Sequence, residues 1–294
     1  MSKPLLLTVV IPVYNRSIEL DRALQSLCSQ TLQNFEVIIC DDGSDEDINV
    51  VADRYRKSLP LQVLRLQHSG GPAHPRNCGV RHAKTTWVSF LDSDDWWDCS
   101  RVEVIANSLN LDCDVYYHRL AVINTSQGST SSRTGVVGFP PGRRGMLTTL
   151  LCKHNPIPLS SAVVRRQAII DVGGFDPTTL EDYDLWIRLA LVGAQFFYAD
   201  QVLGSYSLAK DNISAFTPEQ VRIQKNFFDK TLSRLSGHDL DAANSHFSYL
   251  LCSYALKIND PDWLSSLNGV SFVIDPLRWL KLRAKLFLWG AWRR

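Results

Sequence analysis

Apolar runs alternate with helical patterns along the first third of the chain. Apolar stretches that are typical of buried strands lie at 5–11, 35–40, 61–66 and 87–91. Between them, apolar residues recur at helical spacing over 18–30, 48–59 and 76–84. Strands that alternate with helices predict a largely parallel sheet with right-handed crossovers. The pattern therefore predicts an α/β fold, in which three strand ends share one side of the sheet, at Pro12, Asp41 and Asp92.

The pattern is less regular in the rest of the chain. Further strands are expected at 114–118, 120–123, 161–164, 195–198 and 202–206, and helices at 146–154, 166–172 and from 181 onward. The stretch 124–145 is rich in Ser, Thr, Gly and Pro and predicts a loop. From Thr217 the chain shows helical patterns without strong strands. We therefore expect one α/β domain over 1–215 and a helical C-terminal appendage over 216–294.

Three carboxylates gather directly after the strand expected at 87–91, namely Asp92, Asp94 and Asp95. Folds of the α/β class bind ligands at the carboxyl ends of their strands, and carboxylate oxygens suit Mg²⁺ or Mn²⁺. A divalent cation bound at this edge would be placed to bind the diphosphate group of a ligand. The alternative is a solvated acidic turn, which is the usual meaning of an isolated Asp-x-Asp, so the surrounding motifs decide between the two.

Composition and charge exclude several classes of protein. The 31 Lys and Arg residues nearly balance the 30 Asp and Glu residues, so no global field would recruit nucleic acid. Seven scattered cysteines without a C-x-x-C pair indicate reduced core residues of a cytosolic protein. No apolar run reaches the length of a membrane span, so we expect no transmembrane helix. The expected location is the cytoplasm, with peripheral contact at the inner face of the membrane as an option.

Five short motifs follow one another in a fixed order. They are Val10 to Arg16 (VIPVYNR), Asp41 to Ser44 (DDGS), Arg76 to Gly79 (RNCG), Phe90 to Asp95 (FLDSDD), and Gly173 to Asp176 (GGFD) followed by Glu181 to Trp186 (EDYDLW). Each is weak alone, but the ordered set resembles family 2 glycosyltransferases of the GT-A fold over about residues 5–206. The resemblance implies a Rossmann-like, mostly parallel central sheet flanked by helices. It also implies a catalytic domain with a nucleotide-binding half over about 1–100 and an acceptor half over about 101–215.

The resemblance assigns nucleotide-sugar binding to residues at or near these strand ends, namely Pro12, Tyr14, Asp42, Arg76 and Asp92. Tyr14 would offer its ring to the nucleotide base, above the turn that Pro12 shapes. Asp42 would accept a hydrogen bond from the imide of the base, although the stretch from Asp41 to Ser44 could equally form an Asx turn. Arg76 would lie against the nucleotide, and Asp92 would bind the ribose hydroxyls. In the same motif as Arg76, the Asn and the Gly would support the turn and the packing of the helix.

Transfer from a nucleoside diphosphate sugar needs a neutralised leaving diphosphate and a base for the acceptor hydroxyl. The resemblance assigns the metal, Mn²⁺ or Mg²⁺, to Asp94, while Asp95 would cap the segment that follows. The base would be Asp182, with Glu181 as the less favoured candidate, although a carboxylate at a helix start is often only a cap. A single displacement helped by such a base inverts the anomeric carbon.

The chain departs from the family where a Tyr-Arg-x-His pattern usually follows the closing strand. The segment here is Tyr206 to Ser214 (YSLAKDNIS), in which both the Arg and the His of the pattern are missing. Lys210 is the one cation that could replace them. The second protein ligand of the metal is therefore unassigned, and a weakened activity is an open alternative.

Residues 276–294 combine six cations with three Trp and several Leu. Such a helix could lie on an anionic membrane, or its apolar face could pack on the rest of the chain while the cations stay solvated. Both interpretations stay open at this point. Lipid-linked acceptors, which are common in the family, are consistent with membrane contact.

Together these residues predict an inverting, metal-dependent glycosyltransferase. The donor is a nucleoside diphosphate sugar, which we expect to be a UDP-sugar, and the acceptor is a carbohydrate or lipid-linked hydroxyl, as in the synthesis of cell-surface polysaccharide or glycolipid. The main alternative is a catalytically silent nucleotide-sugar-binding protein, against which the presence of Asp92, Asp94 and Asp182 argues. A nucleotidylyltransferase would carry a Gly-rich basic loop after the first strand, and the stretch from Pro12 to Asn15 is not one.

Overall fold

The computed structural model describes residues 5–109, 112–125, 132–208, 218–258 and 276–292. The chain forms two compact units. The first consists of the described parts of Met1–Pro141, Pro156–Pro177 and Arg188–Asp211, and the second of those of Gly142–Asn155, Thr178–Ile187 and Asn212–Arg294. The division expected at residue 215, and the two halves expected before it, stay predictions.

The first unit is built around one sheet. Its strands are β1 (Leu7–Val13), β2 (Phe35–Asp41), β3 (Leu61–Arg65), β4 (Trp87–Phe90), β5 (Trp96–Trp97), β6 (Val115–Asn124), β7 (Ser132–Val137), β8 (Val163–Arg165) and β9 (Phe196–Leu208). Their order is β3-β2-β1-β4-β8-β6-β9-β5, and β7 pairs with β6. The first four strands are parallel, as are β6 and β9, whereas β5, β7 and β8 pair antiparallel to their neighbours. The parallel first half and the predicted fold class are thus confirmed, and the second half is mixed.

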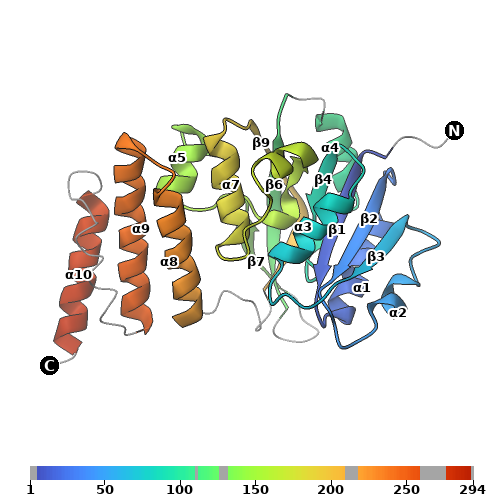
Figure 1. The fold of residues 1–294 in the computed structure, drawn as a ribbon, viewed down its shortest axis with the longest axis horizontal. Helices are drawn as coiled ribbons and strands as arrows, with labels where there is room; N and C mark the ends of the chain where they lie inside the picture. Colours follow the sequence, from blue (N-terminus) through green and yellow to red (C-terminus); the bar gives the residue numbers. More distant parts are fainter. Residues whose placement is uncertain (1–4, 110–111, 126–131, 209–217, 259–275, 293–294) are drawn as a thin grey trace. The chain divides into compact units, whose positions relative to one another are not determined.

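Helices cover the parallel half of the sheet (Figure 1). Leu7, Val9 and Ile11 of β1 share one buried cluster with side chains of α1 (Ser17–Cys28). Val10 points to the opposite face, where α3 (Ala73–His82) approaches so closely that a Cβ added at Gly79 would lie 2.4 Å from Val10 Cγ1. Since β1 is buried on both faces, its sequence is a continuous apolar run and not an alternating one.

Pro12 does not end the first strand, as the sequence indicated, but lies inside β1. The carbonyl oxygen of Val13 accepts the N–H of Asp42, which continues β2. The carbonyl oxygen of Val10 accepts the N–H of Leu91, which continues β4. Because alternate residues of a strand face opposite neighbours, Pro12 faces the β4 side, beyond the end of that strand. Its missing N–H therefore costs no hydrogen bond of the sheet.

Several other elements differ from the sequence prediction. The helix expected over 48–59 is only α2 (Ile48–Ala52), and the turns after it expose Arg and Lys side chains that have no core to cover. The two strands expected over 114–123 form the single strand β6, because Arg119 continues the ladder by pairing with Val202 of β9 across a register shift. The Arg119 side chain also pairs with Asp200 at 2.9 Å. The two expected over 195–206 likewise join in β9. The expected loop contains β7, and β5 was not predicted.

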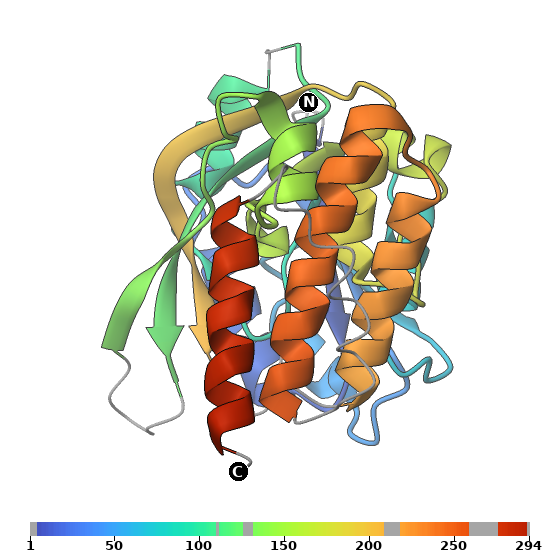
Figure 2. The ribbon, with the colours of Figure 1, turned by 90° about the vertical axis from the view of Figure 1, so that its left-hand side faces the viewer.

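The shorter helices of the first unit are α4 (Arg101–Ser108), the 3₁₀ turn η1 (Leu159–Ser161) and α6 (Arg166–Asp171). The second unit holds α5 (Gly145–Cys152), the first part of α7 (Glu181–Leu191), α8 (Pro218–Leu232), α9 (Gly237–Ile258) and α10 (Pro276–Trp292). The helices α8, α9 and α10 lie side by side (Figure 2), and α9 also contacts α5. Phe228 of α8 stacks on Phe247 of α9 with ring centroids 4.2 Å apart, and Leu282 of α10 is buried against Cys252 of α9. No helix in the described part of the chain has both the length and the hydropathy of a membrane span.

One buried histidine of the second unit makes its stability depend on pH. Burial, together with the nearby charge of Arg278, lowers the pKa of His246 to about 3 from 6.5. Between these two pH values the unfolded chain binds a proton at His246 that the folded protein does not bind. The free energy of unfolding therefore falls as the pH falls below about 6.5.

We expect His246→Leu to make the free energy of unfolding less dependent on pH between about 6.5 and 3. Urea denaturation at a series of pH values measures this dependence. His238→Leu, at an exposed position near the start of α9, is the matched control and should leave the slope unchanged. Equal slopes for His246→Leu and the unmodified protein would contradict the prediction.

Candidate functional site

The parallel half of the sheet brings the predicted strand ends to one edge. Val13 of β1 is paired with Asp41 of β2, and Val10 of β1 with Phe90 of β4. Tyr14 and Asp42 directly follow the first pair, and the acidic loop, Asp92 to Asp95, begins two residues after Phe90. The carboxyl ends of neighbouring strands thus meet where α/β folds bind ligands.

Tyr14 and Asp42 are joined through a histidine that sequence reasoning missed. The exposed ring of Tyr14 stacks on His68, with centroids 4.1 Å apart. Nδ1 of His68 lies 2.9 Å from the carbonyl oxygen of Asp42 and 3.1 Å from its Oδ2. The buried carboxylate of Asp42 accepts the hydroxyl of Ser69 at 2.8 Å and its N–H at 3.0 Å. These contacts build an exposed aromatic face over a fixed carboxylate.

Asp41 serves the structure of the turn. One carboxylate oxygen accepts the N–H of Ser44 at 2.9 Å, which is the Asx turn anticipated from the sequence, and the other pairs with Arg65 at 2.7 Å. Gly43 between them has a φ of +77°, which favours glycine. Both oxygens of Asp41 are thus engaged in holding the loop, and the choice of Asp42 over Asp41 as the ligand contact stays a prediction.

Arg76 is buried beneath the acidic loop and is not an exposed cation. Its Nη2 donates to Asp92 Oδ1 at 2.6 Å, and its guanidinium lies 5.8 Å from the ring of Phe175. The side-chain amide of Asn77 donates to the carbonyl oxygen of Phe175 and accepts the N–H of Phe175, each at 2.8 Å. Gly79 lies directly against Val10 of β1, and together these contacts hold α3 in place. The expected supporting roles of Asn77 and Gly79 are thus confirmed.

Asp94 is paired with an arginine of the first motif. Nη1 of Arg16 donates to Asp94 Oδ2 at 2.6 Å, and Nη2 of Arg22 donates to the carbonyl oxygen of Asp94 at 2.5 Å. Burial raises the pKa of Asp94, and the charge of Asp92 raises it further, while Arg16 opposes both effects. The acidic loop therefore holds two like charges that each need a cationic partner.

Asp95 connects the acidic loop to the far side of the sheet. Its carboxylate is buried, and Oδ1 accepts the N–H of Ser207 in β9 at 2.9 Å. Burial raises the pKa of Asp95 well above its ordinary value, and the charges of Asp92 and Asp94 add to the effect. The expected capping role is thus replaced by a link to β9.

The predicted base lies in the second unit, at the start of α7. Asp182 is half-buried, and its Oδ2 accepts the side-chain amide of Asn155 at 3.1 Å. The fully buried Asp184, two positions on, pairs with Arg234 at 2.6 Å. Asp184 is thus committed to packing α7 against the end of α8. Glu181 is also half-buried, and the choice between it and Asp182 stays a prediction.

Comparison with known proteins tests the resemblance. Residues 8–173, more than half of the chain, match the sequence profile of the family described as glycosyl transferase family 2. The chain belongs to this family. The predicted family and the predicted enzyme class, glycosyltransferase, are thereby confirmed.

Two relatives in this family differ in how much of their length is matched. An uncharacterized glycosyltransferase of Haemophilus influenzae is 33% identical over 63% of this chain, and the match spans only 62% of its own length. The Escherichia coli protein WfaP, named UDP-Glc:alpha-D-GlcNAc-diphosphoundecaprenol beta-1,3-glucosyltransferase, is 25% identical over 75% of this chain and 84% of its own length.

Solved structures of glycosyltransferases share the fold. S. aureus TarS, residues 1–349 in complex with UDP-GlcNAc, superposes with a TM-score of 0.68 at 18% identity, over 96% of this chain and 88% of that chain. The mannosyltransferase PcManGT of Pyrobaculum calidifontis, in complex with GDP-Man and Mn²⁺, has a TM-score of 0.63 at 16% identity, over 99% of this chain and 84% of that chain. At these identities the likeness shows the fold and confirms the GT-A prediction.

The carboxylate oxygens of the acidic loop are suitable ligands for a divalent cation. No group of three or more His, Cys, Asp or Glu side chains in the described ranges could hold a metal by itself. Asp92 and Asp94 are partly exposed carboxylates whose mutual repulsion a cation would relieve. Mg²⁺ is commonly held by one or two carboxylates together with substrate phosphates and water. The Lys210 considered as a replacement cation lies outside the described residues.

Proposed function

We propose that this protein transfers a sugar, with inversion, from a UDP-sugar to the hydroxyl of a lipid-linked or other carbohydrate acceptor. The observation that carries the proposal is the acidic loop at the shared strand edge. Asp92 and Asp94 follow the end of β4, and Tyr14 and Asp42 follow the ends of the neighbouring strands β1 and β2. That edge offers an aromatic face, a fixed hydrogen-bond acceptor and two carboxylates, which are the groups that a nucleoside diphosphate requires.

Recognition of the base rests on Tyr14 and Asp42. His68 beneath Tyr14 holds the tyrosine ring flat, so that the base can stack on its outer face. Asp42, fixed by Ser69, accepts the imide N–H of uracil. TarS, which shares the fold, is known in complex with UDP-GlcNAc, and the name of WfaP gives UDP-Glc as its donor. Both support a UDP-sugar as the donor here.

Recognition of the ribose and the diphosphate rests on the acidic loop. Asp92, oriented by Arg76, accepts hydrogen bonds from the ribose hydroxyls. Asp94 holds the cation, which we propose to be Mn²⁺ or Mg²⁺; PcManGT has been solved with Mn²⁺. When bound, such an ion neutralises the charge that develops on the leaving diphosphate. Arg16, once released from Asp94, is a cation within reach of the same anionic groups.

The proton of the acceptor hydroxyl is taken by Asp182 as the hydroxyl attacks the anomeric carbon. Asn155 donates to Oδ2 of Asp182 at 3.1 Å and so orients the carboxylate. The single displacement inverts the anomeric carbon, because the hydroxyl attacks from the side opposite the diphosphate. Asp184 takes no part, since it is fully buried and pairs with Arg234.

Two faces of α10 support a membrane role for the C-terminal region. Leu282 is 2% exposed and packs on α9, whereas Leu277 and Leu280 are 68% and 53% exposed. Lys281 is exposed on the same helix, whereas Lys285 reaches Tyr249 and Ser253 of α9. We propose that this outer face of α10 lies on the anionic, cytoplasmic side of a membrane, where a lipid-linked acceptor would be met. The name of WfaP includes such an acceptor, a diphosphoundecaprenol.

A catalytically silent nucleotide-sugar-binding protein is the second candidate. The observation that favours it is the Arg16–Asp94 ion pair, which already satisfies the carboxylate proposed for the metal. The Arg and His expected after β9 are also missing from the sequence. Such a protein would bind a UDP-sugar but would show no turnover with any acceptor.

The donor proposal predicts that UDP-GlcNAc or another UDP-sugar raises the melting temperature in the presence of Mn²⁺, because ligands that bind the native state stabilise it. Asp94→Asn should abolish the part of this shift that depends on Mn²⁺. Thermal denaturation against a panel of UDP- and GDP-sugars, followed by calorimetry of UDP with Mn²⁺, measures both effects. Asp53→Asn, at an exposed position, is the matched control and should keep the full shift. An unchanged Mn²⁺-dependent affinity in Asp94→Asn would remove Asp94 from the metal role.

The base proposal predicts that Asp182→Asn retains donor binding while turnover falls by roughly 10²- to 10⁴-fold, the usual contribution of a general base. Asparagine keeps the size and the hydrogen-bonding shape of the side chain but cannot accept the proton. Transfer assays with the donor found above, together with UDP calorimetry, separate the two effects. If Glu181→Gln is inactive while Asp182→Asn is active, the base is Glu181. If both variants keep full activity, the proposed mechanism fails.

The membrane proposal predicts that the double variant Leu277→Glu and Leu280→Glu no longer cosediments with anionic liposomes at low salt. Both positions are exposed, so the packing of Leu282 on α9 should survive, as circular dichroism would show. The matched control changes two exposed valines of the first unit, Val50→Glu and Val192→Glu, and should bind as the unmodified protein does. Failure of the unmodified protein to bind such liposomes would leave α10 a packing element only.

A further inference from the structure

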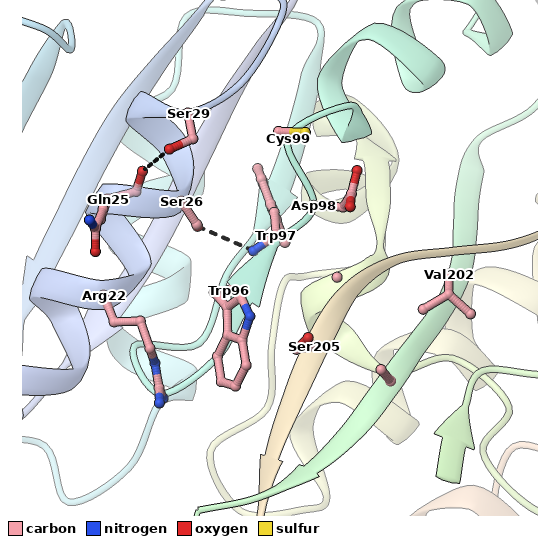
Figure 3. Close-up of a pocket in the computed structure, with 12 residues that line it drawn as sticks. Arg22, Gln25, Ser26, Ser29, Trp96, Trp97, Asp98, Cys99, Val202 and Ser205 are labelled. Atoms are coloured by element: carbon pink, nitrogen blue, oxygen red, sulfur yellow. Dashed lines mark hydrogen bonds between the residues drawn. The ribbon is translucent and has the colours of Figure 1, made fainter. Parts of the chain in front are cut away.

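The first unit contains a pocket that the donor site does not use. It is a cavity of about 440 Å³ between α1, β5 and β9, with further lining from β6 (Figure 3). None of the residues assigned to the nucleotide or the metal lines it. The side chains that define its chemistry are Arg22, Gln25, Ser29, Trp96, Asp98 and Ser205. Its volume lies within the usual range for small-molecule sites.

Several polar groups of this pocket are not engaged by the protein. In the described part of the chain, the Gln25 amide, the Ser205 hydroxyl and the Trp96 indole N–H make no hydrogen bond, although all three side chains border the cavity. Ser29 donates only to the carbonyl oxygen of Gln25, at 3.0 Å. The pocket thus offers donors and acceptors around a half-buried indole, which is an arrangement suited to a ligand with many hydroxyl groups.

The charges of the pocket are already balanced. Arg22 donates to the carbonyl oxygen of Asp94 and lies 4.1 Å above the ring of Trp96. Asp98 accepts the N–H and the hydroxyl of Ser100 through Oδ1. Arg22 and Asp98 contribute one positive and one negative charge, so the lining carries no net charge that would attract a phosphate or a carboxylate. A neutral ligand is therefore favoured over an anionic one.

Hydrogen bonds to α1 and to Gln30, just after this helix, hold the floor of the pocket in place. Trp97 N–H donates to Ser26 Oγ at 3.2 Å, and the amide of Gln30 donates to the carbonyl oxygen of Asp98 at 2.7 Å. With the Arg22 bond to Asp94, these contacts fix the backbone of 94–98 against the helix. A site that is formed before its ligand arrives loses less entropy on binding.

We propose that this pocket is a second saccharide-binding site, distinct from the donor site, and that it takes a neutral sugar. The C–H bonds of a sugar ring pack on the indole of Trp96, since ring C–H groups are attracted to the electron-rich face of an aromatic system. Sugar hydroxyls donate to and accept from the Gln25 amide and the Ser205 hydroxyl. The site holds the saccharide without any chemical step.

Saturation-transfer NMR of the full chain with cellobiose, chitobiose and lactose tests the site. We expect saturation transfer to at least one disaccharide, unchanged when UDP and the diamagnetic Mg²⁺ are added, because the two sites share no residue. Gln25→Ala and Ser205→Ala should each weaken the titrated affinity roughly three- to tenfold, the loss of one hydrogen bond. Gln167→Ala, at an exposed position of α6, is the matched control and should bind as the unmodified protein does.

Three results would overturn the proposal. The first is the absence of saturation for every disaccharide tested. The second is displacement by UDP, which would place the sugar in the donor site. The third is equal affinity in all variants, which would place it elsewhere on the protein. Because the test needs neither turnover nor donor binding, its outcome is independent of the proposed glycosyl transfer.

Discussion

Repulsion between the carboxylates at the end of β4 is the constraint around which this part of the molecule is arranged. Asp92, Asp94 and Asp95 lie within four residues; the charge of Asp92 raises the pKa of Asp94, and the charges of both raise the pKa of Asp95. A buried carboxylate without compensation costs several kcal/mol, so the loop is stable only with partners from elsewhere. Arg76 supplies one partner, Arg16 another, and the backbone of Ser207 a third.

The three partners come from three different elements, so the fold itself is needed to bring them together. Arg76 reaches Asp92 because α3 lies directly on β1, and the absence of a side chain at Gly79 permits that contact. Arg16 stands just before α1, in the turn that follows β1. Ser207 belongs to β9, which lies beyond β8 and β6 in the sheet. The acidic loop thus ties the parallel half of the sheet to its mixed half.

Much of this arrangement could be predicted from the sequence, because its strongest signals are local. The continuous apolar runs of β1 and β2 reflect burial on both faces, and parallel strands place their polar ends at one edge. The choice between Asp41 and Asp42 is a different case. Local turn chemistry predicted the Asx turn of Asp41, but its contact with Arg65, 24 positions away, has no local signal. The choice of Asp42 as the ligand contact stays a prediction.

What the sequence did not reveal depends on contacts between distant segments. His68 lies in a loop without periodicity, and its stacking on Tyr14 has no local signal. The two-residue strand β5 is too short to carry a pattern and exists because β9 pairs with it. Arg16 was part of a motif, yet its partner lies 78 positions away. Pro12 was misread because the rule against proline in strands does not apply on the side where a neighbour has ended.

The two arginine pairs of the acidic loop differ in burial, and that difference bears on which carboxylate can change partners. The Arg76 side chain is 5% exposed, and breaking a buried ion pair by removing one partner typically costs roughly 3–5 kcal/mol. The Arg16 and Asp94 side chains are 28% and 16% exposed, so water can replace part of their interaction. A fully exposed ion pair contributes only about 1 kcal/mol or less to the free energy of unfolding. The Arg16–Asp94 pair lies between this limit and that of a buried pair. Asp94 is therefore the carboxylate that can exchange its guanidinium partner for a metal cation, while Arg76 keeps Asp92 in place. This difference supports the proposed division of the two carboxylates into a metal ligand and a ribose ligand.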